Sequence, residues 1–202
     1  MTVYIIRHGE TAGNAERIVQ FPEVSLNARG MQQAQRLGQR LAEQGIQYII
    51  SSDYQRAQMT AQAIQSASGA ALTLDPDWRE RHFGDLRGRK HSDIGDLYHP
   101  DLDPPNGESW AVFHQRIDRA WAAIRAHLTE AQGGLAIVTH GLVCYSLALR
   151  HLQLPLGHHA HTDFRNASVT EVESTPPWRV VQLNCTAHLD SPALAPTDTG
   201  GV

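Results

Sequence analysis

Two histidines of this sequence stand in the same local context, and that context suits the binding of an anion. His8 follows Arg7 and precedes Gly9, and His140 precedes Gly141. A glycine at such a point lets backbone N–H groups approach an anion closely. Arginine can hold a phosphate through two parallel hydrogen bonds. One histidine after a strand is usually a structural residue, but two in matching positions indicate a shared anion site.

Arg56 is a third candidate because it also follows a polar break in the chain. The apolar run 48–50 predicts a buried strand that stops at Ser51 and Ser52. Arg56 then falls on the first turns of the next predicted helix. Taken alone it could be a solvated helix charge. In this position its side chain can also reach the end of the strand.

The elements that must position these residues are short apolar runs alternating with amphipathic segments. Strand-like runs occur at 3–6, 48–50, 72–74, 135–138, 167–172 and 179–183. Helical patterns follow Asn27 and cover 56–64, 110–128 and 141–152. This alternation favours an α/β class: one three-layer domain over residues 1–189, with a mostly parallel central sheet and helices on both faces.

The remaining segments lack this periodicity. Residues 76–108 are rich in Pro, Gly, His and Asp, and we expect them to form a small cap over one end of the sheet. Ligands of open α/β sheets bind at the carboxyl ends of the strands, where His8 and His140 fall. The sequence therefore predicts a site there. The tail 190–202 is expected to be disordered.

Composition excludes several classes of protein. The chain has 202 residues and a net charge of -4, without the basic stripe that nucleic-acid binding requires. Its apolar runs are far shorter than the ~20 residues of a membrane span. No basic segment precedes the first apolar run, and the two cysteines form no CxxC motif. These features predict a cytoplasmic protein that binds neither nucleic acid nor membrane.

Several strings together resemble the histidine phosphatase superfamily, in its phosphoglycerate-mutase-like group. They are RHGET at 7–11, SSDYQRAQMTA at 51–61, ERHFG at 80–84 and VTHG at 138–141. NGES at 106–109 and NASVT at 166–170 are similar to strings in its smaller phosphatases. The resemblance spans residues 3–189. RHG alone is a short string, but four motifs in the right order and spacing are specific.

The resemblance implies roles for individual residues. His8 would accept a phosphoryl group on a ring nitrogen, and His140 would help to hold that group. Glu80 would donate a proton to the leaving oxygen and later activate water. The implied phosphate ligands are Arg7, Asn14 and Arg56, with Thr11 and the backbone N–H of Gly141 as weaker candidates. His82, within ERHFG, and Phe21 are candidate substrate contacts.

General chemistry supports this division of roles. Phosphoryl transfer spreads charge over three oxygens, so the enzyme must mainly position groups and supply positive potential. Neighbouring arginine charges keep an imidazole neutral, as a nucleophile must be, and a carboxyl beside a phosphate has a raised pKa. Because no acidic cluster resembles a magnesium site, we expect no metal and no cofactor. His158, His159 and His161 are expected to be surface residues without a metal.

Some positions depart from the family pattern. Gly13 stands where many relatives carry Trp, and Phe21 stands where relatives often read Gly. Phe21 should therefore reshape the substrate entrance. The segment 89–105 is shorter than the cap insertion of a glycolytic mutase.

The resulting hypothesis is metal-independent hydrolysis of a small phosphorylated metabolite through a phosphohistidine. A cofactor-dependent phosphoglycerate mutase using the same residues is the first alternative, and a non-catalytic phospholigand binder is the second. A mutase must shield its phosphohistidine from water, which the short segment 89–105 does not favour. The sequence leaves the oligomeric state open, a homodimer included.

Overall fold

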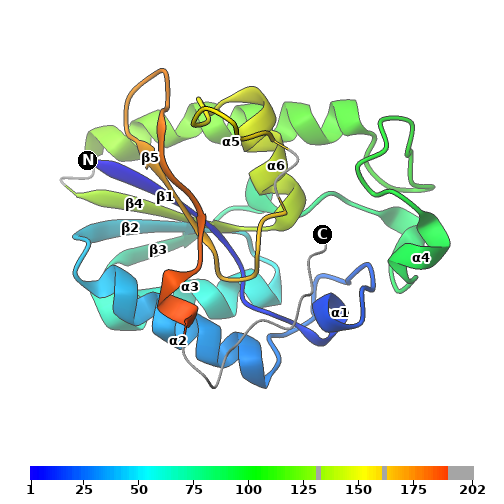
Figure 1. The fold of residues 1–202 in the computed structure, drawn as a ribbon, viewed down its shortest axis with the longest axis horizontal. Coiled ribbons are helices and arrows are strands. Elements are labelled where there is room, and N and C mark those ends of the chain that lie inside the picture. The colour runs from blue at the N-terminus through cyan, green and yellow to red at the C-terminus, as the bar shows by residue number, and fades with distance from the viewer. Residues whose placement is uncertain (131–132, 161–162, 191–202) are drawn as a thin grey trace.

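A six-stranded sheet forms the centre of the computed structural model, which describes residues 1–130, 133–160 and 163–190 (Figure 1). Its strands are β1 (Thr2–Arg7), β2 (Ile46–Ser51), β3 (Ala71–Leu74), β4 (Gly134–Thr139), β5 (Val169–Glu173) and β6 (Val180–Cys185), in the order β3-β2-β4-β1-β5-β6. Strands β3, β2, β4 and β1 are parallel, and β5 is antiparallel to both its neighbours. The predicted α/β class with a mostly parallel sheet is confirmed.

Four longer helices match the predicted helical patterns. They are α2 (Ala28–Ala42), α3 (Gln55–Ser68), α5 (Trp110–Glu130) and α6 (Gly141–Arg150). Helix α2 starts at the predicted cap, because the Asn27 side chain accepts a hydrogen bond from the backbone of Gly30. The short helices α1 (Ala12–Ala15) and α4 (His91–Ile94) were not predicted. Within the described segments, no helix is long and apolar enough to cross a membrane.

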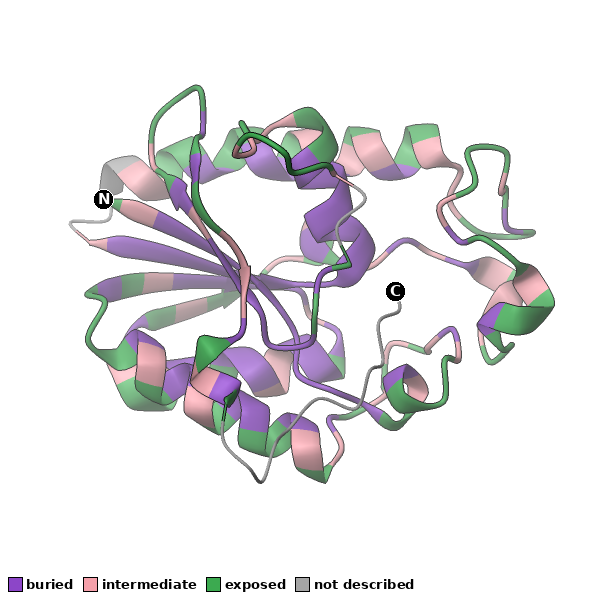
Figure 2. Ribbon diagram, in the orientation of Figure 1, coloured by how far each residue is buried: buried purple, intermediate pink, exposed green. Residues whose placement is uncertain are grey.

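Each face of the sheet buries its own core. Alternate residues of a strand point to opposite faces. Val3 and Ile5 of β1 therefore belong to the core formed with α5 and α6, while Tyr4 and Ile6 belong to the core formed with α2 and α3. The central strands are buried along nearly their whole length (Figure 2). Helices thus cover both faces, as the sequence predicted.

The strand register brings three chain segments to one edge of the sheet. Arg7 pairs with Thr139, and Ser51 pairs with Val138, so β1, β2 and β4 end at the same level. The backbone N–H of His8 continues this pattern by donating to the carbonyl of Thr139 at 2.9 Å. The predicted convergence of the strand ends is therefore confirmed.

The segment 76–108 covers this edge and is held by the loop after α1. The backbone N–H of Val19 donates to the carbonyl of Arg89 at 3.0 Å, and the N–H of Gly88 donates to the carbonyl of Val19 at 2.7 Å. Gly88 turns the chain with a φ of 82°. Residues 76–108 pack against the loop after α1 and do not present one face of a long helix or strand. Their sequence therefore shows no hydrophobic period.

Other predictions fall on the C-terminal part of the chain. His158 and His159 are exposed, in accordance with the prediction, whereas His161 lies outside the described residues. Disorder was predicted for the tail 190–202, of which residues 191–202 also lie outside them.

Candidate active site

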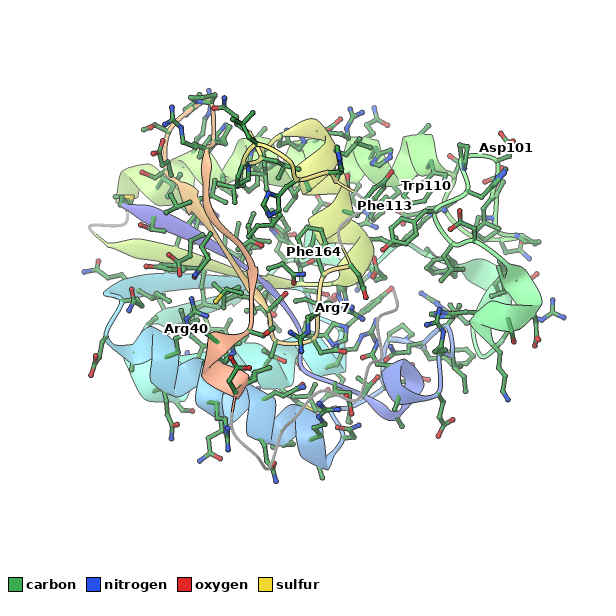
Figure 3. The ribbon with its side chains drawn as sticks, viewed as in Figure 1. Arg7, Arg40, Asp101, Trp110, Phe113 and Phe164 are labelled. Carbon is green, nitrogen blue, oxygen red and sulfur yellow. The ribbon has the colours of Figure 1, made fainter. Side chains whose placement is uncertain are left out.

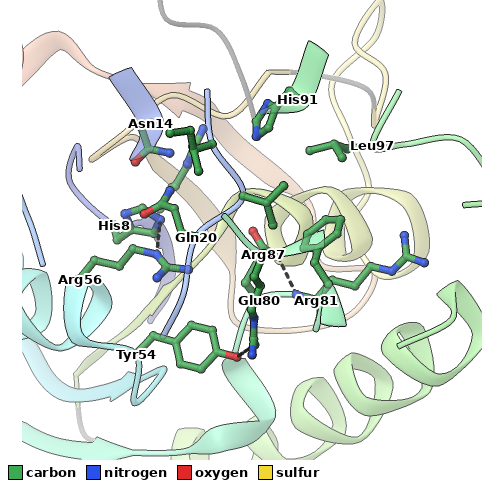
Figure 4. A pocket seen from close by; sticks show the side chains of 14 residues that line it. His8, Asn14, Gln20, Tyr54, Arg56, Glu80, Arg81, Arg87, His91 and Leu97 are labelled. Carbon is green, nitrogen blue, oxygen red and sulfur yellow. Dashed lines mark hydrogen bonds between the residues drawn. The ribbon is translucent and has the colours of Figure 1, made fainter. Parts of the chain in front are cut away.

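His8 sits at the end of β1 with one defined ring orientation. Its Nδ1 lies 2.7 Å from the carbonyl oxygen of Gly9. A carbonyl only accepts hydrogen bonds, so Nδ1 carries the proton and Nε2 keeps its lone pair. The Nε of Arg56 donates to that Nε2 at 3.2 Å (Figure 4). Burial and the charges of Arg56 and Arg7 hold the pKa of His8 well below its usual value, so the ring is neutral at pH 7.

Arg56 reaches His8 from the first turn of α3. A second donor, Nη1, binds the carbonyl of Phe21 at 3.0 Å, and the guanidinium lies 5.2 Å from the ring centre of Tyr54. Burial lowers the pKa of Arg56 to about 10, so it stays charged at neutral pH. The position of Arg56 follows from the start of α3, where the Ser52 hydroxyl accepts the backbone N–H of Tyr54 at 3.2 Å.

Arg7 is the last residue of β1, and its side chain is almost completely buried. One terminal nitrogen donates to the carbonyl of Phe164, beside which it lies in Figure 3. A Cβ added to Gly141 would lie 3.6 Å from the Arg7 guanidinium carbon. The guanidinium therefore lies next to the N-terminus of α6, and the two together concentrate positive potential at this edge.

His140 precedes α6 and contacts His8 directly. The two ring centres are 5.1 Å apart in an edge-on arrangement. The Nε2 of His140 lies 2.8 Å from the Ser52 hydroxyl, while its Nδ1 has no hydrogen-bond partner among the described residues. Burial, followed by the charge of Arg56, lowers the pKa of His140 well below its usual value. Both histidines are therefore neutral at pH 7.

Glu80 supplies a carboxyl group to the cavity that His8 also lines. Its two oxygens accept the backbone N–H groups of Arg81 at 3.0 Å and Leu142 at 3.2 Å. Arg116 of α5 fixes the chain leading to it, through the carbonyls of Asp77 at 2.8 Å and Arg79 at 2.9 Å. Burial raises the pKa of Glu80, against the lowering effect of these hydrogen bonds and of the nearby arginines. The direction of this shift favours the protonated form of the carboxyl.

The cavity lies between the strand ends and the cap and encloses about 440 Å³ of empty space, its mouth included. Its lining comprises Arg7, His8, Asn14, Ile18, Val19, Gln20, Tyr54, Arg56, Glu80, Arg81, Phe83, Arg87, His91 and Leu97. The lining thus includes four arginines and one carboxylate. Across the described residues, no three His, Cys, Asp or Glu side chains are grouped so as to hold a metal ion. The positive potential of the cavity comes from arginine.

The other predicted residues take different positions. Thr11 is fully buried, and its hydroxyl accepts the backbone N–H of Asn14 at 3.0 Å, which caps α1. Gly141 is the first residue of α6 and lies against the Arg7 side chain. It is not among the residues that line the cavity. Phe21 contributes its carbonyl to Arg56, while its ring is exposed near Gly88. His82 lines a neighbouring cavity with Asn106 and Glu108.

Sequence reasoning missed several lining residues: Gln20, Tyr54, Arg81, Arg87 and His91. Tyr54 stands two residues before Arg56 within a recognised motif, so its proximity could have been inferred. Arg87 and His91 fall in the aperiodic cap, where no pattern in one sequence indicates which side chains turn inward.

Comparison with known proteins places this site in a family. The model of the histidine phosphatase superfamily (branch 1) matches residues 3–186. The chain is 34% identical to the "Probable phosphoglycerate mutase GpmB" of Citrobacter koseri, over 96% of this chain and 97% of the relative.

Solved structures agree with the sequence comparison. A mycobacterial glucosyl-3-phosphoglycerate phosphatase, solved with VO3, has a TM-score of 0.79 and 25% identity, over 92% of this chain and 99% of its own. A phosphoglycerate mutase from Thermus thermophilus has a TM-score of 0.66 and 30% identity, over 90% of this chain and 97% of its own. This chain belongs to the histidine phosphatase superfamily, branch 1.

Proposed function

We propose that this protein hydrolyses a phosphomonoester through a phosphohistidine on His8, with Nε2 as the attacking atom. The observation that carries the proposal is the hydrogen bond from Nδ1 to the carbonyl of Gly9. It leaves the lone pair of Nε2 facing Arg56, in a cavity that carries an excess of positive charge. A neutral, oriented imidazole between arginines is suited to attack a phosphate dianion.

The first step transfers the phosphoryl group from the leaving oxygen to Nε2 of His8. The P–O bond breaks, an N–P bond forms, and Glu80 gives its proton to the departing alkoxide. Arg7, Arg56 and His140 stabilise the charge on the transferring oxygens, and Asn14 binds the phosphate. The arginines supply charge stabilisation that a metal ion provides elsewhere.

The second step releases phosphate. Glu80, now ionised, takes a proton from a water molecule, which attacks phosphorus as the N–P bond breaks. The imidazole returns to its neutral form and the carboxyl is protonated again.

A mutase is the second candidate, because a 34% identical relative carries that name. The reaction of a mutase differs only in the acceptor, which is the bound product rather than water. The higher TM-score to the phosphatase and the short segment 89–105 support hydrolysis. A phospholigand binder without activity would not need a nucleophile and an acid in one cavity.

One assay separates the three candidates. The purified protein is incubated in EDTA with a panel of metabolite phosphates, and both inorganic phosphate and the 2- and 3-isomers of phosphoglycerate are measured. We expect phosphate release that persists in EDTA, an acid-labile phosphoryl adduct at His8, and the loss of both in His8→Asn. Isomerisation without release would establish the mutase. Binding with neither product would establish the ligand-binding protein, and loss of release in EDTA would overturn the metal-independent mechanism.

A further inference from the structure

Arg87 is a charged group in the cavity wall that the proposed reaction does not use. It is half-buried, and its Nη2 donates to the hydroxyl of Tyr54 at 3.0 Å. In the parts of the chain that the structure describes, no carboxylate lies within ion-pair distance of it. A half-buried guanidinium without a counter-ion is costly unless a ligand provides one.

The other three arginines of the cavity already have defined contacts. Arg7 and Arg56 lie beside His8, where the transferable phosphate binds in the proposed reaction. Arg81 holds the cap, because its Nε donates to the carbonyl of Glu108 at 3.0 Å and its guanidinium stacks over Trp110 at 4.2 Å. Arg87 is the cavity arginine that lies neither beside His8 nor among the contacts that hold the cap.

The backbone around Arg87 is held by two hydrogen bonds to the loop after α1. The following residue, Gly88, donates to the carbonyl of Val19, and the carbonyl of Arg89 accepts from the N–H of Val19. These two hydrogen bonds anchor the turn to the loop that carries Gln20. Binding through a preorganised side chain loses less conformational entropy than ordering a mobile one.

Tyr54 sets the relation between the two cationic positions. Arg56 lies over the face of its ring, 5.2 Å from the centre, whereas Arg87 binds its hydroxyl (Figure 4). The two guanidinium groups thus contact different parts of one phenol side chain. Both residues line the same cavity, together with His8 and Glu80.

We infer that the substrate of this enzyme carries a second anionic group, a carboxylate or a second phosphate, which binds Arg87 while the transferable phosphate lies at His8. The inference rests on the proposed phosphatase function. The planar guanidinium fork matches either anion through two hydrogen bonds. His91 lines the same cavity, and burial lowers its pKa to about 4. Its neutral ring can therefore add a hydrogen bond without a charge.

Matched substrate pairs test the inference. Phosphoserine carries a carboxylate that phosphoethanolamine lacks, and 3-phosphoglycerate carries one where glycerol 3-phosphate has a hydroxymethyl group. 1,3-Propanediol bisphosphate and 3-hydroxypropyl phosphate form the pair for a second phosphate. We expect a higher kcat/KM for the member with the extra anion in at least one pair. Arg87→Gln should lower kcat/KM for that member by about 10- to 100-fold, the effect of losing one charge-assisted hydrogen-bonded pair, and leave the other member nearly unchanged.

Arg89→Gln is the matched control, because Arg89 is exposed in the same turn and its loss removes the same charge. Arg89→Gln should leave kcat/KM unchanged for both substrates of a pair. Arg87→Lys, which keeps the charge, should retain part of the preference for the substrate with the extra anion. Equal losses for both members, or no preference in the wild type, would overturn the inference. Calorimetric titration of His8→Asn with the same pairs measures binding without turnover. Absence of any hydrolysis would thus refute the proposed function, while the titration still decides on the Arg87 subsite.

Discussion

The orientation of His8 depends on main-chain groups rather than on another side-chain carboxylate. Gly9 accepts from the ring, and the His8 carbonyl itself accepts from the backbone of Ala167 at 3.1 Å and the side chain of Asn166 at 3.1 Å. The residue is therefore held on both sides of its Cα. The identity of His8 as a site residue could be predicted from sequence, but the attacking nitrogen could not, because it depends on the ring torsion relative to Gly9.

The role of Glu80 can be tested by varying the leaving group. Glu80→Gln keeps the size and one hydrogen-bonding oxygen but removes the transferable proton. For an alkyl phosphate, whose alkoxide needs protonation, the first step should slow by about 10²–10⁴. For p-nitrophenyl phosphate the first step should slow far less, and phosphohistidine should accumulate because the second step has lost its base. Rapid-quench kinetics measures both steps.

Two other carboxylates of the cap serve as comparisons. Asp85 is exposed, so Asp85→Asn should leave the rate of the first step unchanged for both the alkyl phosphate and p-nitrophenyl phosphate. Glu108 is held by Arg116 at 2.7 Å, and the pKa of Glu108 is lowered, with hydrogen bonds from Arg116 and the His82 backbone outweighing burial. A carboxylate in that state is a poor proton donor. Equal slowing of the first step for both leaving groups would show that Glu80 is not the acid.

The contribution of Arg56 can be measured in the same way. It donates to His8 and to the Phe21 carbonyl at once, a geometry that one ammonium group cannot reproduce. We expect Arg56→Lys to lower kcat by about 10²–10³, as the loss of one preorganised donor does in other enzymes. Arg125→Met, at an exposed position on α5, should have no effect. A rise in KM with an unchanged kcat would mean that Arg56 stabilises the bound substrate and the transition state equally.

At the scale of elements, the start of α2 holds the loop that follows His8. Glu10 makes four hydrogen bonds there. Its carboxylate accepts from the side chains of Asn27 at 2.9 Å and Arg29 at 3.1 Å, its carbonyl accepts from the backbone N–H of Asn27 at 3.0 Å, and its own N–H donates to the side chain of Gln33 at 2.8 Å. Gly30 brings the helix close enough for these contacts, since a Cβ at that position would lie 2.0 Å from the Glu10 carbonyl oxygen.

Gly30→Ala should therefore reduce both stability and activity. The added methyl group must push Glu10 away from α2, and His8 moves with it. We expect a lower Tm and a lower kcat toward p-nitrophenyl phosphate, with a destabilisation of about 1–3 kcal/mol, typical of overpacking. Gln35→Ala, on the exposed side of α2, should be close to wild type in both measurements. An unchanged Tm would contradict the close approach.

The elements also show where sequence reasoning succeeds. Strands such as β1 and β4 and the long helix α5 were predicted because one hydrophobic pattern decides each of them. The cap was predicted over 76–108, but its course was not, since that course depends on backbone pairing of Val19 with Gly88 and Arg89, which leaves no period in the sequence. Thr11 illustrates the same limit, because its hydroxyl caps α1, a helix too short to be recognised by periodicity.

At the scale of the whole molecule, several buried histidines affect how stability depends on pH. The pKa values of His8 and His140 are lowered by burial and nearby arginines, and burial lowers those of His91 and His188 to about 4. In the unfolded chain each titrates near 6.5. As pH falls below 6.5 the unfolded state therefore takes up more protons. The free energy of unfolding falls by about 1.4 kcal/mol per pH unit for each histidine until its folded pKa is reached.

We accordingly expect Tm to decrease steadily between about pH 6.5 and pH 5, before most carboxylates titrate. His188 lies far along the chain from the site residues and binds Arg40 through Nδ1 at 3.2 Å. His188→Asn should reduce the slope of Tm against pH, whereas His158→Asn, at an exposed position, should not. The raised pKa of Glu80 acts in the opposite direction and offsets part of the slope. A Tm that rises on acidification would contradict this account.

The position of β1 in the sheet decides when during synthesis this strand can pair with its neighbours. Both hydrogen-bonding neighbours of β1, β4 and β5, come from residues 134–173, so this apolar strand is synthesised more than 120 residues before either of them. Until then its two edges and its Val-Tyr-Ile-Ile run are open to pairing with other chains. A nascent chain that stalls before β4 therefore exposes a strand prone to aggregation.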